Sequence, residues 1–409
     1  MKRKIILAWR NLWRNKKRTY ITLGSVTFAV IVATMMRGLQ LGTYDKMLDD
    51  AIKSTTGHVA IMDKLYWDDK TLLNSMDFSP ELEDELNKDE KIDFWIPQLI
   101  SGVLVSSGPH TRGVMVQGID PQIQDQQMGL ADKIIDGEYL SLDDEAVLIG
   151  KELSQFLRIG VGDTLVVLGQ GYMGVTAAGK YPIKGIFDHP MAEFNKRLVF
   201  LPLPAAQYLF FMEGRLTNIN LVLKDNSEVE EAQKYYETRM DTSLLEARGW
   251  RSMNKEILSG IESDNFFGKI MIGILYMVIG FGLFGTILMM TMERKKEFSI
   301  MIAIGMRRTK LLTQIIIESI MIASIGALAG LIISFPIVYF YYLNPIPVPE
   351  ESAEMYRQMN MEPILQISIK PDYMMVQFAI VLMVSIIASI IPLNNIMKFN
   401  IVDIIRGRQ

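Results

Sequence analysis

Residues 266–330 read FFGKIMIGILYMVIGFGLFGTILMMTMERKKEFSIMIAIGMRRTKLLTQIIIESIMIASIGALAG. The stretch contains two long apolar runs, and a short basic segment separates them. About 20 apolar residues, each rising about 1.5 Å, allow a helix to cross the hydrocarbon core of a bilayer. The stretch therefore predicts two membrane-spanning helices with a short connection between them.

Two more apolar runs begin near Tyr20 and Tyr373 in the 409-residue chain. The long segment 44–265 separates the first run from the second. We predict a membrane α-helical protein with four transmembrane helices and a large α+β domain inserted between helices 1 and 2. The predicted order is an amphipathic helix at 1–18, transmembrane helix 1 at 19–43, the α+β domain at 44–265, transmembrane helix 2 at 266–291, a connection at 292–310, transmembrane helix 3 at 311–342, a loop at 343–372, transmembrane helix 4 at 373–397 and a tail at 398–409.

Basic residues predict the orientation of these helices. Segment 1–18 contains eight Lys and Arg residues and 292–310 contains six, whereas 343–372 contains two. The positive-inside rule therefore places both termini and the 292–310 connection in the cytoplasm, and segment 44–265 outside. That segment has 21 Lys and Arg against 37 Asp and Glu. Its acidity favours plain solubility, with attraction of a basic partner as the alternative.

The first 18 residues predict an amphipathic helix. Their apolar side chains fall on one side of a helix, and the basic residues fall largely on the other. Such a helix lies in the inner headgroup layer of a membrane. No continuous apolar core precedes Tyr20, so we do not expect a cleaved signal peptide. The apolar set comprises Ile5, Ile6, Trp9, Leu12 and Trp13.

Segment 44–265 mixes strand and helix patterns without a regular alternation, which predicts an α+β domain. The strand patterns lie at 58–62, 94–105, 113–118, 146–149, 164–168, 181–187, 197–202 and 218–223, and the helical patterns lie at 80–88, 151–157, 204–212 and 227–240. From Asn254 the pattern continues as one helix into the second apolar run. The loop 343–372 has four prolines between Asn344 and Pro363 and is expected to be an extended cap.

Motifs of catalysis are missing from the sequence. It has no cysteine and no phosphate-binding glycine loop, and His58, His110 and His189 lack the spacing of metal ligands. We therefore expect no catalytic site, no metal, no bound cofactor and no nucleic-acid partner in this chain.

The connection 292–310 predicts a short amphipathic helix parallel to the membrane. Charged residues at 293–297 precede an apolar stripe, and Gly305 interrupts the pattern. The pattern fits a simple interfacial helix and a surface that docks into a cytoplasmic partner equally well.

The third apolar run contains Glu318, Gly326 and Gly330. Small residues four apart let membrane helices approach closely, so we assign both glycines to helix packing. A carboxylate inside a transmembrane run suggests either a polar contact with a neighbouring helix or part of an ion pathway. For Glu318, near the cytoplasmic end, we favour the helix contact.

The segments ERKKEFSIMIAIGMRR, QIIIESIMIASIGALAG and PLNNIMKFNIVDIIRGR resemble the FtsX/MacB/LolC superfamily, the permeases of mechanotransmission-type ABC transporters. The resemblance implies a non-catalytic subunit whose coupling helix contacts a cytoplasmic ATPase dimer, which binds ATP and Mg²⁺. The coupling residues implied are Glu293, Arg294, Glu297, Ile300, Ala303, Ile304 and Gly305.

The N-terminal region and the segments VQGIDP, IIDGEYL, EAVLIGKELSQFLRIGVGDTLVVL and YPIKGIFD resemble the lipoprotein-releasing LolC/LolE branch. The resemblance implies a bacterial inner-membrane protein with a periplasmic domain, which pairs with a second permease subunit, identical or paralogous. It further implies release of lipoproteins to a periplasmic carrier. The alternatives are MacB-like export of peptides or small molecules and FtsX-like signalling to a periplasmic hydrolase.

The same branch implies two further sites. Lipid-modified cargo would enter between helix 1 of one subunit and helix 2 of the other, in contact with membrane lipids. A hairpin at 170–180 corresponds to the loop that binds the carrier, or is an ordinary flexible hairpin. The implied cavity residues are Met35, Met36, Leu39, Phe267, Met271 and Ile274, and the implied hook residues are Gln170, Tyr172, Met173 and Lys180.

Overall fold

The computed structural model describes residues 2–240, 243–358 and 362–397. The chain divides into two compact units. The helical unit contains the chain up to Asp45, Gly260–Ile346 and the described residues from Leu365 onward, and the α+β unit contains Lys46–Ser259 and Pro347–Ile364. The predicted tail 398–409 lies outside the described residues.

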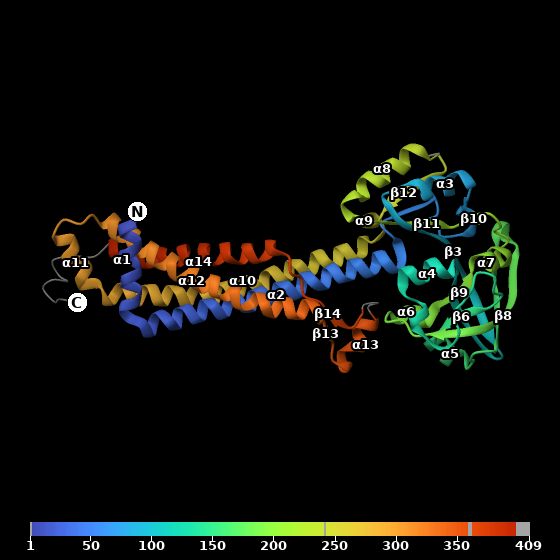
Figure 1. Cartoon of the computed structure of the whole chain (residues 1–409). Helices are drawn as coiled ribbons and strands as arrows, with labels where there is room; N and C mark the ends of the chain where they lie inside the picture. Colours follow the sequence, from blue (N-terminus) through green and yellow to red (C-terminus); the bar gives the residue numbers. More distant parts are fainter. Residues whose placement is uncertain (1, 241–242, 359–361, 398–409) are drawn as a thin grey trace. The chain divides into compact units, whose positions relative to one another are not determined.

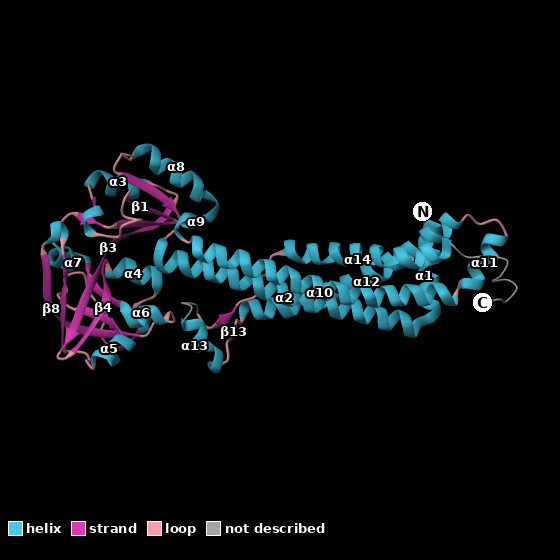
Figure 2. Cartoon of the chain, turned by 180° about the vertical axis from the view of Figure 1, so that it is seen from behind, coloured by secondary structure: helices cyan, strands magenta, loops and turns pink. Residues whose placement is uncertain are grey.

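Among the described residues, four helices are long and apolar enough to cross a membrane. Their bounds are α2 (Lys16–Ala51), α10 (Lys255–Glu293), α12 (Arg308–Leu343) and α14 (Pro371–Met397). Within the helical unit these helices run side by side (Figures 1 and 2). The predicted N-terminal amphipathic segment forms α1 (Lys2–Leu12) and a single turn, η1 (Trp13–Asn15), before α2 begins.

Glycines on α12 allow a close approach to α2. A Cβ atom added at Gly326 would lie 2.8 Å from the side chain of Val26, and one at Gly330 would lie 2.7 Å from Val30. The hydroxyl of Thr27 donates a hydrogen bond of 3.1 Å to the carbonyl oxygen of Gly326. Such contacts hold membrane helices together, because burial against lipid-like neighbours gives little association by itself.

The α+β unit has two halves, and the long strand β3 (Ile92–Ser107) belongs to both. In the first half, six strands close into a barrel in the order β3–β4–β9–β6–β8–β7, because β7 pairs with β8 and also with β3. Alternate side chains of β3, such as Leu99, Val103 and Val105, point into its core. The other barrel strands are β4 (His110–Ile119), β6 (Val147–Gly150), β7 (Thr164–Gln170), β8 (Thr176–Phe187) and β9 (Leu198–Pro202).

Helices cover this barrel and complete its core. Leu153 and Leu157 of α5 (Lys151–Leu157) and Leu209 and Phe210 of α7 (Leu203–Phe210) are buried in the same apolar cluster. Further elements around the barrel are α4 (Pro121–Met128), η4 (Ala131–Lys133), β5 (Ile134–Gly137), η5 (Tyr172–Gly174) and α6 (Ala192–Arg197).

The second half is an antiparallel sheet of β12 (Leu245–Gly249), β1 (Val59–Asp63), β11 (Asn218–Leu223) and the first part of β3. Helix α8 (Val229–Arg239) contributes Tyr236, fully buried, to its core, and α3 (Pro80–Lys88) contributes Leu86. The remaining elements are η2 (Ile52–Thr56), η3 (Leu72–Asn74), β2 (Met76–Asp77), β10 (Arg215–Leu216), η6 (Asn226–Glu228) and α9 (Trp250–Met253).

A chain of buried amides lies where β3 passes from one half to the other. The Asn218 side chain donates hydrogen bonds to the side-chain oxygens of Gln98, at 3.0 Å, and Asn220, at 2.8 Å. The amide of Asn220 donates to the backbone carbonyl of Thr55 at 2.7 Å, in the turn that follows α2. Asn218, Gln98 and Asn220 are therefore linked to one another and to the backbone, as burial away from water requires.

The predicted α+β class is confirmed, and each predicted strand and helix of segment 44–265 has a counterpart in the structure. The helical patterns at 80–88 and 151–157 coincide with α3 and α5. The predicted continuous helix from Asn254 into the second apolar run is α10. The sequence patterns missed α4, α6, β5 and β12, which are short and lack a clear period.

The expectation of an extended loop at 343–372 was wrong. The segment contains α13 (Glu350–Gln358) and a two-stranded pairing of β13 (Ile346–Pro347) with β14 (Ile364–Leu365), and residues 347–364 belong to the α+β unit. Pro349 precedes α13, and its carbonyl accepts hydrogen bonds from the N–H groups of Ser352 and Ala353. The prolines therefore flank a helix instead of extending the whole loop.

Candidate coupling site

A short helix, α11 (Lys295–Ala303), connects α10 to α12. It ends in a pair of backbone hydrogen bonds of 3.0 Å, from Met306 N–H to the Met301 carbonyl and from Gly305 N–H to the Ile302 carbonyl. This arrangement is the Schellman motif, which requires a residue in the left-handed region. Gly305 has φ of +99°, which explains why glycine ends the helix here.

The inward face of α11 is anchored by apolar packing. Phe298, 1% exposed, packs in a cluster with Ile287 of α10 and with Leu311 and Ile315 of α12. The guanidinium carbon of Arg294 lies 4.8 Å from the centre of the Phe298 ring. A buried aromatic side chain and a cation against its ring both fix the short helix to its neighbours.

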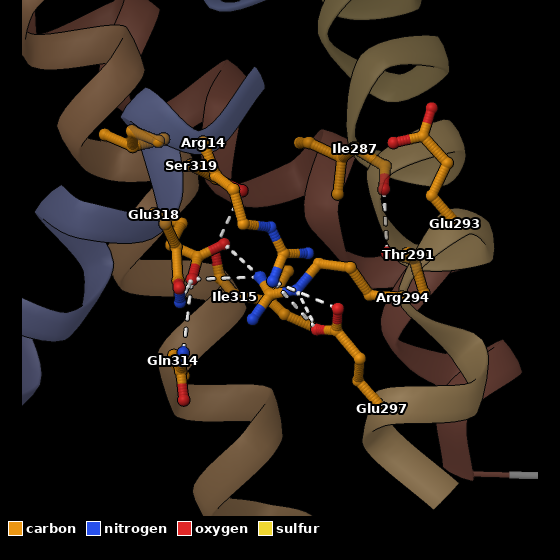
Figure 3. Close-up of polar contacts among 12 residues, drawn as sticks. Arg14, Ile287, Thr291, Glu293, Arg294, Glu297, Gln314, Ile315, Glu318 and Ser319 are labelled. Atoms are coloured by element: carbon orange, nitrogen blue, oxygen red, sulfur yellow. Dashed lines mark hydrogen bonds and ion pairs between the residues drawn. The ribbon is translucent and has the colours of Figure 1, made fainter. Parts of the chain in front are cut away.

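A buried ion pair lies beneath α11 (Figure 3). Glu318, 0% exposed, accepts hydrogen bonds from Arg294 Nη1, at 3.0 Å to Oε2 and 3.2 Å to Oε1. Its Oε1 also accepts from Asn11 Nδ2 at 2.7 Å and from Gln314 Nε2 at 3.2 Å. The carboxylate is thus paired and hydrogen-bonded to groups from α1 and α12 and to the residue between α10 and α11. A buried charge requires such compensation.

A second set of ion pairs lies nearer the surface. Arg14 Nη1 is 3.0 Å from Glu297 Oε1, Arg294 Nε is 3.4 Å from Glu297 Oε2, and Arg18 Nη1 is 2.7 Å from Glu293 Oε2. Burial alone would raise the pKa of Glu297, but its hydrogen bonds and charge attraction to Arg14 and Arg294 lower it. Such partly exposed pairs contribute little stability each, yet Arg14–Glu297 links α11 to the turn η1, and Arg18–Glu293 links α10 to α2.

The outward face of α11 is apolar and exposed. Ile300 is 55% exposed and Ile304 is 79% exposed, and Ala303 lies between them at helical spacing. Lys296 and Glu297 lie one turn earlier on the same face. Exposed isoleucines on a helix whose inward face is anchored form a surface suited to docking of a partner protein.

The structure separates the seven predicted coupling residues into two groups. Glu293, Glu297, Ile300, Ala303, Ile304 and Gly305 are exposed. Arg294 is not: its side chain is 7% exposed and points inward to Glu318 (Figure 3). The guanidinium of Arg294 is therefore engaged inside the chain, where it anchors the start of α11.

The predicted cavity residues do not share one surface of the chain. Phe267, Met271 and Ile274 lie exposed on α10. Met36 and Leu39 of α2 instead pack against buried clusters of the helical unit, and Met35 is partly exposed. Helical periodicity explains the difference, because neighbouring positions of α2 face in different directions.

The predicted hook is a short β-hairpin. Gln170 and Lys180 lie within β7 and β8, in pairs with Thr176 and Val166. The five-residue tip, 171–175, is closed by a hydrogen bond of 2.7 Å from Gly171 N–H to the Val175 carbonyl. The ring of Tyr172 lies 4.7 Å from the Arg215 guanidinium, whereas Met173 is 69% exposed. Gln170 and Lys180 are also exposed, whereas Gly171 at the start of the tip is buried.

Sequence reasoning missed the contributions of the N-terminal segment. Asn11, Arg14 and Arg18 each bond to an acidic residue that lies between 275 and 307 positions later. Their basic character predicted orientation, but local periodicity carries no information about such distant partners.

The geometry defines a class of protein: a bundle of membrane-spanning helices with a large inserted domain and a short, firmly anchored helix between two of the spans. Residues 19–238 match the family described as MacB-like periplasmic core domain, and residues 269–401 match FtsX-like permease C-terminal. The first match covers more than half of the chain. The chain belongs to the FtsX/MacB/LolC superfamily of ABC transporter permeases.

Similar proteins include LolC, the lipoprotein-releasing system transmembrane protein of Xylella fastidiosa (strain 9a5c), 23% identical over 244 residues, which are 58% of each chain. The macrolide export ATP-binding/permease protein MacB of Hyphomonas neptunium is 27% identical over 150 residues, 35% of this chain and 23% of that protein. The solved periplasmic region of MacB from Actinobacillus actinomycetemcomitans has a TM-score of 0.37 and 14% identity, covering 52% of this chain and 97% of that one. The chain thus matches less than two thirds of the length of these curated relatives.

Proposed function

We propose that the chain is the permease subunit of an ABC complex, in which ATP hydrolysis by a cytoplasmic ATPase dimer moves the α+β unit. The observation that carries the proposal is the outward face of α11, where Ile300, Ala303 and Ile304 are exposed. On the opposite face, Phe298 and Arg294 anchor the helix to the rest of the helical unit. ATP and Mg²⁺ would bind to the partner subunits. This chain would supply the surface that receives their movement.

The anchoring of α11 gives a route for that movement. Arg294, Phe298 and Glu297 connect α11 to α12 and to the N-terminal segment, so a push on α11 moves several helices together. Helix α10 begins at Lys255 and α2 ends at Ala51, both within the α+β unit, so two uninterrupted helices continue from the bundle into it. Packed helices shift as rigid bodies, which supports transmission over this length.

We infer that the cargo is lipid-modified protein, released from the inner membrane of a bacterium with two membranes. Similarity to LolC supports this choice, together with the exposed apolar side chains of Phe267, Met271 and Ile274 on α10. Methionine and phenylalanine adapt to acyl chains of varied shape. A second permease, identical or paralogous, would complete the cavity, and the hairpin tip with Met173 would contact a periplasmic carrier.

Export of peptides or small molecules is the second candidate. The match of residues 19–238 to the MacB-like periplasmic core family favours it specifically. Both candidates use the same coupling site, and they differ in the chemistry of the cargo that contacts α10.

The coupling proposal is tested by Ala303→Asp. The substitution places an unpaired carboxylate in the docking surface, which costs on the order of 2–5 kcal/mol of binding when desolvated. We expect the ATPase subunit to be lost when the tagged permease is purified from membranes. Ala303→Val retains an apolar surface and should retain the ATPase.

The matched control is Thr309→Asp. Thr309 is exposed in the first turn of α12, where the helix N-terminus tolerates a carboxylate, and it lies outside α11. This variant should copurify with the ATPase. Equal recovery of the ATPase with Ala303→Asp and Thr309→Asp would refute the assignment of the docking surface.

The cargo is tested with a photo-crosslinking amino acid at Met271, with Ile332 of α12, which is 71% exposed, as the control position. Lipoprotein release predicts that Met271 captures acylated proteins, identified by their lipid-modified N-terminal peptides, and that Ile332 captures lipid alone. Capture of unacylated peptides at Met271 would favour the export function.

A further inference from the structure

Residues of α1 and of the turn η1 line a shallow hollow next to the coupling site. Its volume is about 560 Å³, and its lining consists of Leu7, Trp9, Arg10, Asn11, Trp13 and Arg14. Two arginines one helical turn apart thus face a hollow that also contains two indole rings. We propose that this hollow binds the phosphate headgroup of an anionic phospholipid.

Cationic groups in the hollow are available to a ligand. Arg10 is exposed and forms no ion pair with any side chain that the structure describes. Within the described residues, Arg14, 53% exposed, is paired with the half-exposed Glu297 alone. A guanidinium binds phosphate oxygens through two parallel hydrogen bonds, so two guanidiniums at this spacing complement a phosphate diester.

Aromatic and apolar side chains beside the arginines favour a lipid over a soluble anion. The rings of Trp9 and Trp13 meet edge to face with centroids 5.6 Å apart, and Trp13 meets Tyr20 at 5.5 Å. Ile6 is 60% exposed and Ile21 is 70% exposed. Indole rings favour the headgroup level of a bilayer, where the exposed isoleucines would contact acyl chains.

Arg14 connects the lipid site to the coupling site. Its guanidinium is shared between the hollow and Glu297, which lies on the outward face of α11. A phosphate in the hollow competes with Glu297 for Arg14. The lipid therefore changes the ion pairs that orient α11, which gives the composition of the membrane an influence on coupling.

This inference rests on the proposed function only for placing α1 at a membrane surface. The experiment uses the full chain in lipid nanodiscs, without ATPase or cargo, so its outcome is independent of what is transported. The lipids carry bromine on their acyl chains, which quenches nearby tryptophan fluorescence. In one series of nanodiscs, brominated phosphatidylglycerol replaces increasing fractions of unbrominated phosphatidylcholine. In the second series, brominated phosphatidylcholine replaces it instead. The quenching of tryptophan fluorescence is compared between the two series.

The background fluorescence comes from Trp67, Trp95 and Trp250, and a W9F/W13F variant measures it. We expect half-maximal quenching at a mole fraction at least tenfold lower for phosphatidylglycerol than for phosphatidylcholine. Arg10→Gln should remove this preference. Lys17→Gln is the matched control, because Lys17 is exposed nearby but does not line the hollow, and should weaken the preference by about fivefold at most.

Three results would overturn the proposal. Equal quenching by the two lipids would exclude a headgroup preference. An equal loss of the phosphatidylglycerol preference in Arg10→Gln and Lys17→Gln would show a diffuse attraction of the lipid to basic residues, without a site. Displacement of the lipid by millimolar soluble glycerol phosphate would show an anion site that does not need a membrane.

Discussion

At the scale of single residues, Glu318 shows what a carboxylate inside an apolar helix needs from its surroundings. Its oxygens accept from Arg294, Asn11 and Gln314, and no water is needed to satisfy them. A buried pair adds little stability compared with well-packed apolar residues, but loss of one partner leaves an uncompensated charge. The arrangement therefore acts chiefly to specify where α11 lies.

We expect Glu318→Gln to destabilise the helical unit by about 3–5 kcal/mol, because Arg294 would remain buried without its main counter-charge. Glu297, 3.4 Å away from Arg294 Nε, reduces this cost. The double variant Arg294→Gln/Glu318→Gln should recover part of the lost stability, as thermal unfolding in detergent measures. The pairing would be contradicted if the double variant lost more stability than the two single variants lose when their losses are added.

His189 of the α+β unit predicts a dependence on pH. It is 7% exposed, and burial, with repulsion by Lys133, lowers its pKa to about 4. Since the unfolded histidine has a pKa of about 6.5, the unfolded chain binds the proton first as the pH falls. Stability contributed by neutral His189 is therefore complete above about pH 6.5, and about 3 kcal/mol is lost as the pH falls to about 4.

The check is denaturant unfolding of the full chain in detergent at pH 7 and pH 4.5. His189→Gln should reduce the loss of stability between the two pH values, whereas the same change at the less buried His110 should not. Burial also lowers the pKa of His58, so part of the slope should remain. An unchanged slope in His189→Gln would exclude this residue as its source.

At the scale of helices and strands, the contact of α12 with α2 depends on the absence of a side chain. We expect Gly330→Ala to destabilise the bundle by about 1–3 kcal/mol, because its Cβ would meet Val30 and also the backbone carbonyl of Thr27 at 2.9 Å. Gly285→Ala on α10 is the control, since a Cβ there meets nothing within 4 Å. Melting temperatures that fall equally in both variants would contradict the packing argument.

Elements with a clear period could be predicted from the sequence, whereas the partners of their side chains could not. Continuous apolar runs predicted α2, α10, α12 and α14, because crossing a bilayer imposes a length. Gly305 predicted the end of α11 through its backbone conformation. The partners of Glu318 come from α1, α12 and the residue before α11, and no local pattern encodes that meeting.

At the scale of the whole molecule, charge separates the two units and predicts topology. Segment 44–265 is strongly acidic, whereas the rest of the chain has 21 Lys and Arg against 9 Asp and Glu. We expect cysteines placed singly at the exposed Asp143 and Lys296 to react with impermeant reagents from opposite sides of the membrane. The native sequence has no cysteine, so the background is clean.

Lys296→Cys should be labelled only after the membrane is opened, and Asp143→Cys in intact spheroplasts. Labelling of both after detergent treatment is the control for accessibility. Reaction of both cysteines in intact spheroplasts would reject the topology, and with it the cytoplasmic docking of α11.

The register of β1 has a consequence for how the chain is made. Both neighbours of β1 come much later, since Val59 pairs with Leu221 in β11 and with Gly249 in β12. Leu221 follows Val59 by about 160 residues, which a ribosome adds in roughly 8–32 s at 5–20 residues per second. During that interval, the backbone N–H and C=O groups of β1 have no strand to pair with on the nascent chain. The sheet of the second half therefore cannot form around β1 until most of the α+β unit has been synthesised.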